Sequence, residues 1–150
     1  CRCDDDAVAR YAARISGPLL DRIDLHVALR PVPWRELDAP RGETSSADVR
    51  ARVLAARERQ AKRSAGGWRC NGESPDAAID AQVDATAEAR KLLGRAVEQL
   101  ALSARAARRT LKVARSIADL ADEARTNAAA IAEALTYRAA ETTDDLSRRI

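Results

Sequence analysis

Residues 103–122 read SARAARRTLKVARSIADLAD, and this stretch decides the kind of fold. On a helical wheel its apolar and small residues gather on one side, and five cations fall within roughly 120° of one another on the other side. The pattern predicts an amphipathic helix with one face packed inside the protein. The five cations are Arg105, Arg108, Arg109, Lys112 and Arg115.

Helical periodicity extends over most of the chain around this stretch. Aromatic residues make up only 3% of the sequence, and it contains no Phe and no Met. Because a β-sandwich needs β-branched and aromatic residues at alternating positions, the composition favours a mainly α protein with alanine-packed interfaces. Besides 103–122, helices are predicted over residues 4–15, 45–63, 76–83, 84–100 and 127–138, with a short helical turn over 18–22 and loops over 30–43 and 65–75.

One segment is predicted as a strand. Residues 23–29 (IDLHVAL) alternate apolar and other residues. A lone strand is not stable in water, and no second convincing strand follows it in the chain. The segment is therefore expected to join a sheet formed by other strands. The single histidine, His26, lies in its middle and is expected to be packed rather than catalytic, since no Ser or Cys partner is near it in the sequence.

Several functional classes are excluded by motifs that the sequence lacks. It has no Gly-x-x-x-x-Gly-Lys-Ser/Thr loop and no acidic pair ending an apolar strand, so the chain alone has no visible means of hydrolysing ATP. No apolar run approaches the roughly 20 residues of a membrane span, and no signal peptide opens the chain. A cytoplasmic protein without a membrane partner is expected. Three cysteines, an odd number, argue against a closed disulfide framework.

The basic faces of two helices form one candidate site. The helix over 45–63 contains six basic residues against two acids, and the helix over 103–122 has the five-cation face. Guanidinium groups form forked contacts with phosphate, so both faces suit a polyanion. A solvated surface, a nucleotide phosphate, a nucleic acid backbone and an acidic neighbour remain alternatives. The candidates for contact with nucleic acid are Arg57, Arg59, Arg63, Arg108, Arg109, Lys112 and Arg115.

Two shorter patterns are further candidates. In Asp21-Arg22-Ile23-Asp24 an arginine lies between two acids, which favours either a structural ion pair or an arginine aimed outward at a phosphate in a neighbouring subunit. Cys1-x-Cys3 is half of a metal-binding pattern. Structural zinc takes four ligands, so zinc is not expected in this chain by itself.

Taken in order, several of these stretches resemble the C-terminal part of the magnesium-chelatase-like AAA+ ATPases of the competence protein ComM type. The most specific stretch is SGPLLDRID, residues 16–24; the others are residues 1–3, 49–57, 102–106, 113–121 and 131–138. The resemblance implies the C-terminal end of an AAA+ α/β core, with one strand, followed by a helical-bundle lid. The implied divisions are the core end with its arginine-finger turn (1–30), a loop and connecting helix (31–75), the lid (76–138) and a flexible tail (139–150).

The resemblance also implies roles for single residues. Arg22 occupies the arginine-finger position, from which a guanidinium reaches the γ-phosphate bound by the adjacent subunit of a ring. Arg105 matches the second-sensor arginine, which couples the lid to the nucleotide. Cys1 and Cys3 match the second pair of a four-cysteine cluster, which would hold zinc only with cysteines upstream. ATP and Mg²⁺ are implied for a full-length protein, and no cofactor is expected in this chain alone.

At the level of the whole protein, the resemblance implies a homo-oligomeric ring, a hexamer. The ring would remodel DNA, by helicase or branch-migration work in natural transformation. A function from another class stays open: a non-enzymatic basic helical module that binds nucleic acid or a protein partner. The sequence departs from the family pattern at residues 71–75 (NGESP), which only loosely resemble an Asn-Ala-x-x-Pro-Gly element.

Overall fold

The computed structural model describes residues 3–15, 17–20, 22–38, 44–64 and 67–138. Within these ranges the structure is helical, as the sequence predicts. The helices are α1 (Asp5–Ala12), α2 (Gly17–Leu20), α3 (Trp34–Leu37), α4 (Ser46–Arg63), α5 (Ile79–Val83), α6 (Ala87–Gln99), α7 (Ala104–Leu120) and α8 (Ala128–Thr136), with 3-10 turns η1 (Asn71–Glu73) and η2 (Asp76–Ala78). None of the described helices is long and apolar enough to cross a membrane.

Side-chain caps explain where the long helices begin. The Ser45 hydroxyl accepts a hydrogen bond from the backbone N–H of Asp48 at 3.2 Å, and the Asp48 carboxylate accepts one from the Ser45 N–H at 3.0 Å. This reciprocal capping box starts α4 as the sequence predicts. Thr86, Ser103 and Asn127 cap α6, α7 and α8 in the same position with a single side-chain acceptor each.

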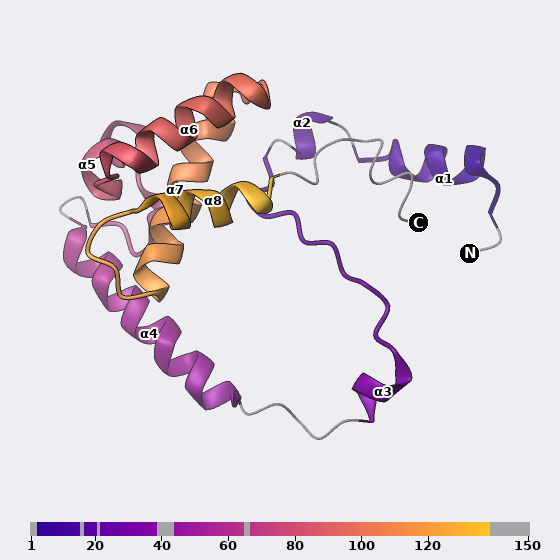
Figure 1. Cartoon of the computed structure of the whole chain (residues 1–150), viewed down its shortest axis with the longest axis horizontal. Coiled ribbons are helices and arrows are strands. Elements are labelled where there is room, and N and C mark those ends of the chain that lie inside the picture. The colour runs from indigo at the N-terminus through magenta and orange to yellow at the C-terminus, as the bar shows by residue number, and fades with distance from the viewer. Residues whose placement is uncertain (1–2, 16, 21, 39–43, 65–66, 139–150) are drawn as a thin grey trace.

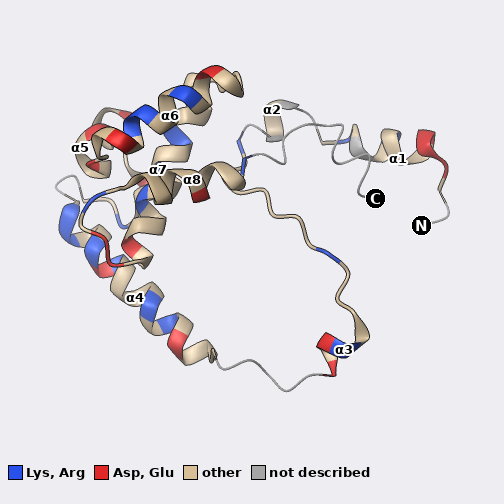
Figure 2. Cartoon of the chain, viewed as in Figure 1, with Lys and Arg blue, Asp and Glu red and all other residues tan. Residues whose placement is uncertain are grey.

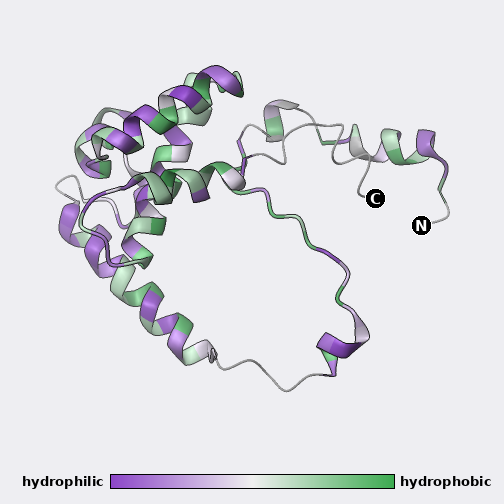
Figure 3. Ribbon diagram, in the orientation of Figure 1, coloured by the Kyte–Doolittle hydropathy of each residue, from purple (hydrophilic) through white to green (hydrophobic). Residues whose placement is uncertain are grey.

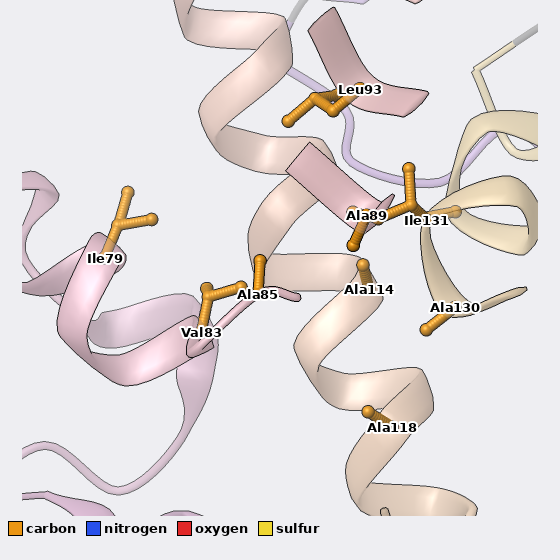
Figure 4. Close-up of a cluster of buried hydrophobic side chains, with 10 residues drawn as sticks. Ile79, Val83, Ala85, Ala89, Leu93, Ala114, Ala118, Ala130 and Ile131 are labelled. Carbon is orange, nitrogen blue, oxygen red and sulfur yellow. The ribbon is translucent and has the colours of Figure 1, made fainter. Parts of the chain in front are cut away.

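Helices α4 to α8 gather into one bundle, and α7 contacts α4, α5 and α8 within it (Figure 1). The core of this bundle is packed mainly by alanine, as expected from the composition. Ile131 of α8 lies close to Ala89 of α6 and Ala114 of α7, and all three side chains are fully buried (Figure 4). Small side chains at these positions let the helix backbones approach closely, so one β-branched residue fills the space between three helices.

The N-terminal segment lies outside this bundle. Helices α1 and α2 and the extended stretch that leads to α3 lie to one side of the packed helices (Figure 1). The stretch contains apolar residues (Figure 3) that face solvent: Val27 is 63% exposed, Leu29 91% and Trp34 76%. These residues contribute almost nothing to the core.

The strand predicted over residues 23–29 is not formed. No named strand occurs in the described ranges, where the one isolated bridge joins Ala85 to Thr126. The reason is the one that the sequence itself suggests: a strand needs a neighbour to share its backbone hydrogen bonds, and the described residues offer none. The segment is tied down instead by a hydrogen bond from the backbone N–H of His26 to the Tyr137 carbonyl, 2.9 Å long.

Several further boundaries differ from the prediction. The helix expected over 4–15 ends as α1 at Ala12, and the helix expected over 84–100 begins as α6 at Ala87, after the Thr86 cap and an Asp84 with positive φ. The loop expected over residues 30–43 contains the single-turn helix α3, and the helix expected over 76–83 is divided into η2 and α5. The division follows the sequence, because Pro75 leads into a 3-10 turn before the regular helix starts. The flexible tail expected over residues 139–150 lies outside the described residues.

Candidate functional site

An open hollow on the N-terminal half of α7 collects most of the predicted basic face. Its cavity volume is about 610 Å³, and four cations and one carboxylate line it. The cations are spaced three or four residues apart, which places them on one side of the helix. The lining residues are Arg105, Arg108, Arg109, Lys112, Ala104 and Asp76.

Two of these cations are partly occupied by the chain that precedes α5. The Arg108 Nη1 donates to the backbone carbonyl of Asp76 at 3.0 Å. The Lys112 Nζ donates to the Ser74 carbonyl at 2.7 Å and lies 3.8 Å from the Asp76 carboxylate. These bonds hold the Ser74–Asp76 backbone against α7 and form one wall of the hollow.

The Arg105 side chain is differently placed. It is exposed and lines the hollow near the start of α7. Within the described ranges its guanidinium makes no hydrogen bond and no ion pair. None of its five donors is therefore taken up by another described residue, and an anion in the hollow can accept from them.

Arg22 lies in a helical turn that touches the same helix. Its backbone N–H donates to the Leu19 carbonyl at 3.0 Å, which closes the turn, and its side chain is exposed. The Arg109 Nη1 donates both to the backbone carbonyl of Arg22 and to the Asp24 carboxylate, the latter at 2.5 Å. Asp24 is therefore paired with Arg109 rather than with its sequence neighbour Arg22, whose guanidinium makes no ion pair with any described residue.

Arg115, the fifth member of the predicted basic face, is not on the surface. Its side chain is 1% exposed, and its guanidinium donates to the Asp119 carboxylate and to the backbone carbonyls of Glu123 and Ala124. The expectation that it contributes to an exposed face is therefore wrong. The helical wheel placed it correctly by angle, but the turn after α7 folds back over that part of the helix and covers it.

Asp119 is the centre of a buried polar network that the sequence analysis missed. The carboxylate is fully buried and accepts hydrogen bonds from Arg63 at 2.6 and 2.7 Å, from Arg115 at 2.9 Å and from Asn71 at 2.9 Å. Gln82 of α5 donates to the Asn71 side-chain carbonyl at 2.8 Å. The network thus joins α4, η1, α5 and the end of α7 inside the bundle.

The environment of Asp119 shifts its acidity. Burial alone would raise the pKa of this carboxyl, but the hydrogen bonds from Arg63 and Asn71 and the positive charges of Arg115 and Arg63 outweigh burial and hold the pKa below its ordinary value. Asp119 is therefore ionised whenever the protein is folded near neutral pH. Its role in the bundle is structural.

The predicted nucleic-acid candidates on α4 also divide into residues held by the Asp119 network and a residue outside it. Lys and Arg are spread along the helix (Figure 2). Arg63 belongs to the Asp119 network, and Arg59 donates to the Asp119 backbone carbonyl at 3.0 Å and forms an ion pair with Asp122. Arg57 remains exposed. Of the three nucleic-acid candidates on α4, only Arg57 is left clear of the network among the described residues.

The Arg57 side chain lies against Cys70 and near Glu73. Burial alone would raise the pKa of the Cys70 thiol, but hydrogen bonds from the Arg57 side chain and from the backbone N–H groups of Glu73 and Gly72 hold it below its ordinary value. Cys70 lies beside a small pocket between α4, η1 and α7.

The predicted cysteine pair does not form a metal site within the described residues. Cys1 lies outside them, and Cys3 is exposed. No group of three or more His, Cys, Asp or Glu side chains in the described ranges is placed to hold a metal ion. The described residues therefore offer no zinc site, and zinc binding by Cys1 and Cys3 together with upstream cysteines stays a prediction.

The local sequence contains weak signals of the network. Arg115 and Asp119 are four residues apart on one helix, a spacing at which opposite charges meet, and NGESP opens with the asparagine that joins the network. Neither signal indicates burial. The partner that makes the network possible, Arg63, is 56 residues away in sequence from Asp119.

Comparison with known proteins agrees with the two-part organisation. A family model described as "Magnesium chelatase, subunit ChlI C-terminal" matches residues 43–138, which contain the helical bundle. A second, "Magnesium chelatase, subunit ChlI", matches residues 1–37, which contain the Arg22 turn. The chain therefore belongs to the magnesium chelatase subunit ChlI C-terminal family. The family resemblance recognised in the sequence is confirmed.

Individual proteins also match most of this chain in sequence. The competence protein ComM of Haemophilus influenzae is 39% identical over 140 residues, which are 92% of this chain and 27% of the relative. An uncharacterized protein of Escherichia coli, YifB, is 39% identical over 142 residues, and one of Mycobacterium tuberculosis is 37% identical over 139 residues, with the same coverage. The chain spans about a quarter of the length of these curated relatives.

Proposed function

We propose that this chain works as the C-terminal part of a ring-forming AAA+ ATPase of the ComM type. In this proposal Arg22 reaches the γ-phosphate of ATP bound by the adjacent subunit, and Arg105 contacts a nucleotide phosphate from the lid. Membership of the magnesium chelatase family and the identity to competence protein ComM over 92% of the chain support it.

The hollow on α7 is the observation that favours this function most. It is open to solvent, it contains four cations against one carboxylate, and the uncommitted Arg105 guanidinium lies in it. Arg109 lines the hollow and also binds the backbone carbonyl of Arg22, so the Arg22 turn lies beside the hollow. A phosphate group is the ligand whose charge and geometry such an arrangement suits.

The chemistry asked of these arginines is charge stabilisation. As the γ-phosphoryl group is transferred, negative charge spreads over its oxygens, and a guanidinium placed there in advance stabilises the transition state. Mg²⁺, which would neutralise phosphate charge when bound with ATP, finds no ligand cluster in the described residues.

The proposed use of ATP hydrolysis is DNA remodelling, with branch migration in natural transformation as the specific form and a hexamer as the ring. The name of the Haemophilus influenzae relative, a competence protein, supports this assignment. Arg57 and Arg108 are exposed and could face DNA. Arg59, Arg63 and Arg115 are held by the Asp119 network and are left out of the proposed DNA surface.

Substitution of Arg22 tests the proposal in the full-length ATPase. Arg22→Ala should lower turnover by about 10³–10⁵-fold, because it removes a group that acts in the transition state. Binding of a fluorescent ATP analogue should stay within about twofold, since binding energy common to both states is unaffected. The matched control is Arg90→Gln, which removes an exposed arginine paired with Asp80 and should leave turnover unchanged. Full turnover in Arg22→Ala would contradict the proposal.

Mixing two inactive subunits tests whether Arg22 acts across a subunit boundary. Arg22→Ala subunits are mixed with subunits whose phosphate-binding loop is disabled. An intact loop can then meet an intact Arg22 at some interfaces, so ATP turnover should return in the mixture. If each subunit used its own Arg22, no mixing ratio would restore activity.

The width and charge of the hollow also favour a second function, a basic module that binds nucleic acid without the rest of an ATPase. Binding by the 150-residue chain alone, measured by fluorescence anisotropy at 50 and 200 mM salt, separates the two. Tight binding that falls steeply with salt and is lost in Arg105→Ala would favour the module. Weak binding by the chain alone, with ATPase activity in the full-length protein, favours the ATPase.

A further inference from the structure

Arg109 makes the contact that joins the two parts of the chain. It lies on α7 one turn after Arg105, and its side chain is only 22% exposed. A single terminal nitrogen, Nη1, donates both to the Arg22 backbone carbonyl and to the Asp24 carboxylate, across 87 and 85 residues of sequence. The Arg109 side chain therefore binds the backbone of the Arg22 turn as well as the side chain of Asp24.

Little else holds this turn in place among the described residues. Its apolar side chains are only partly covered: Leu19 is 48% exposed, Ile23 40% and Leu25 48%. The next anchor along the chain is the backbone hydrogen bond from His26 to Tyr137 at the end of α8. Partial apolar burial is non-directional and does not set where Arg22 points, so among the described contacts the directional Arg109 bonds are the main determinant of the turn's position on α7.

We infer that Arg109 is the positioning residue for Arg22 and makes the Arg22 turn and α7 move as one unit. This inference rests on the proposed function. If Arg105 on α7 senses a nucleotide phosphate, a shift of the helix is passed through Arg109 to the Arg22 turn. Hydrolysis at the neighbouring site then depends on the position of α7 in the subunit that supplies Arg22.

The first test is a kinetic comparison in the full-length ATPase. Because Arg22 acts in the transition state, Arg109→Gln should lower kcat by about 10- to 100-fold and leave the KM for ATP within about twofold. Arg109→Lys retains one cationic donor and should recover part of the lost kcat. Arg90→Gln, which removes an arginine from an exposed ion pair on α6, is the matched control. A rise in KM with kcat unchanged would show that Arg109 binds nucleotide directly, and would overturn the inference.

A double-mutant cycle with Arg22 is the sharper test. If Arg109 acts through Arg22, then Arg109→Gln should cause no further loss in a protein that already has Arg22→Ala. Equal losses in both backgrounds would show that Arg109 acts independently, and the inference would fail while the finger assignment stood. Full activity of Arg22→Ala alone would instead remove the proposed function, so the two failures are distinguishable.

Asp24 provides a variant that leaves α7 untouched. Asp24→Asn removes the charge that Arg109 binds and should lower kcat in the same direction, with no additional loss when combined with Arg109→Gln. An unchanged thermal unfolding midpoint in Asp24→Asn separates mispositioning from unfolding. Normal kcat in a folded Asp24→Asn protein, together with normal kcat in Arg109→Gln, would overturn the inference.

Discussion

Arginines of nearly the same sequence context do three different things on α7. Arg105 is exposed and makes no side-chain bond to another described residue, Arg109 binds a turn distant in sequence, and Arg115 is buried against Asp119. Their intrinsic chemistry is identical, so their surroundings decide which role each has. A charge removed from water must be paired and hydrogen-bonded, and Arg115 meets this condition with a carboxylate and two backbone carbonyls.

Replacing the network's central acid should destabilise the bundle strongly. Asp119→Asn keeps the side-chain shape but leaves the buried Arg115 and the partly buried Arg63 without their counter-charge. We expect the free energy of unfolding to fall by about 3–5 kcal/mol, as when one partner of a buried ion pair is removed. Urea unfolding followed by circular dichroism measures it. Asp122→Asn is the matched control: its carboxylate is 77% exposed, so the loss should stay below about 1 kcal/mol.

The same residue should give the bundle a characteristic acid sensitivity. The pKa of Asp119 is depressed in the folded protein, so the unfolded chain takes up this proton first as the pH falls. The stability that Asp119 contributes is therefore complete above the ordinary carboxyl pKa of about 3.9 and is lost as the pH falls through the lower folded pKa. In Asp119→Asn, the free energy of unfolding should depend less on pH over this acidic range. A wild-type slope that persists in the variant would contradict the assignment.

At the scale of elements, α4, α5 and α8 pack on α7, and α6 packs on α8. Its capped start, its uninterrupted length and its alanine side let α4, α5 and α8 approach it from different directions. Ala114 and Ala118 are 0% and 1% exposed, which leaves no room for a longer side chain. In the sequence the alanines indicate only weak hydrophobicity. In the structure their small side chains allow the helices to pack closely.

Enlarging the α7 interface should therefore be costly. Ala114→Leu adds three carbons where α7 faces α6 and α8, and the overpacking should lower the free energy of unfolding by about 1–3 kcal/mol. Thermal or urea unfolding measures the change. Ala132→Leu places the same side chain on the exposed side of α8 and should change stability by less than about 0.5 kcal/mol. Equal effects at the two positions would show that helix packing is not the cause.

The molecule as a whole consists of a packed bundle and an N-terminal segment that is not packed on itself. The bundle buries its core within residues 56–138, whereas the segment before α4 leaves its large apolar side chains exposed. The two are joined in the described structure by the Arg109 contact and the hydrogen bond from His26 to Tyr137. The bundle's stability is therefore expected to be largely its own.

Removing residues 1–38 tests this separation. The truncated chain loses one partly exposed ion pair and a few hydrogen bonds, which together contribute about 1 kcal/mol or less. Its thermal unfolding midpoint should fall by no more than about 8 °C, and its helical circular dichroism should be retained. Loss of cooperative unfolding would show that the N-terminal segment is part of the folding unit.

Much of this organisation was predictable from local pattern. The capping box at Ser45, the serine start of α7, the helical class and the alanine interfaces all follow from residues within a turn or two of one another. The segment over 23–29 was misassigned as a strand because alternation reports which side chains share a face and says nothing about whether a partner strand is present. The roles of Arg22 and Arg105 remain proposals that rest on the family resemblance.

The sequence by itself determined where α4, α7 and α8 start, that one side of α7 is apolar and which family the chain belongs to, because these depend on short-range spacing and on specific strings such as SGPLLDRID. Only the tertiary structure decided which cations are free to meet an anion. Burial of Arg115, the pairing of Arg63 with Asp119 and the grip of Arg109 on the Arg22 turn join residues 4 to 87 positions apart. Solvent access and long-range pairing are properties of the packed chain, and a helical wheel, which gives only angular positions on one helix, predicts neither.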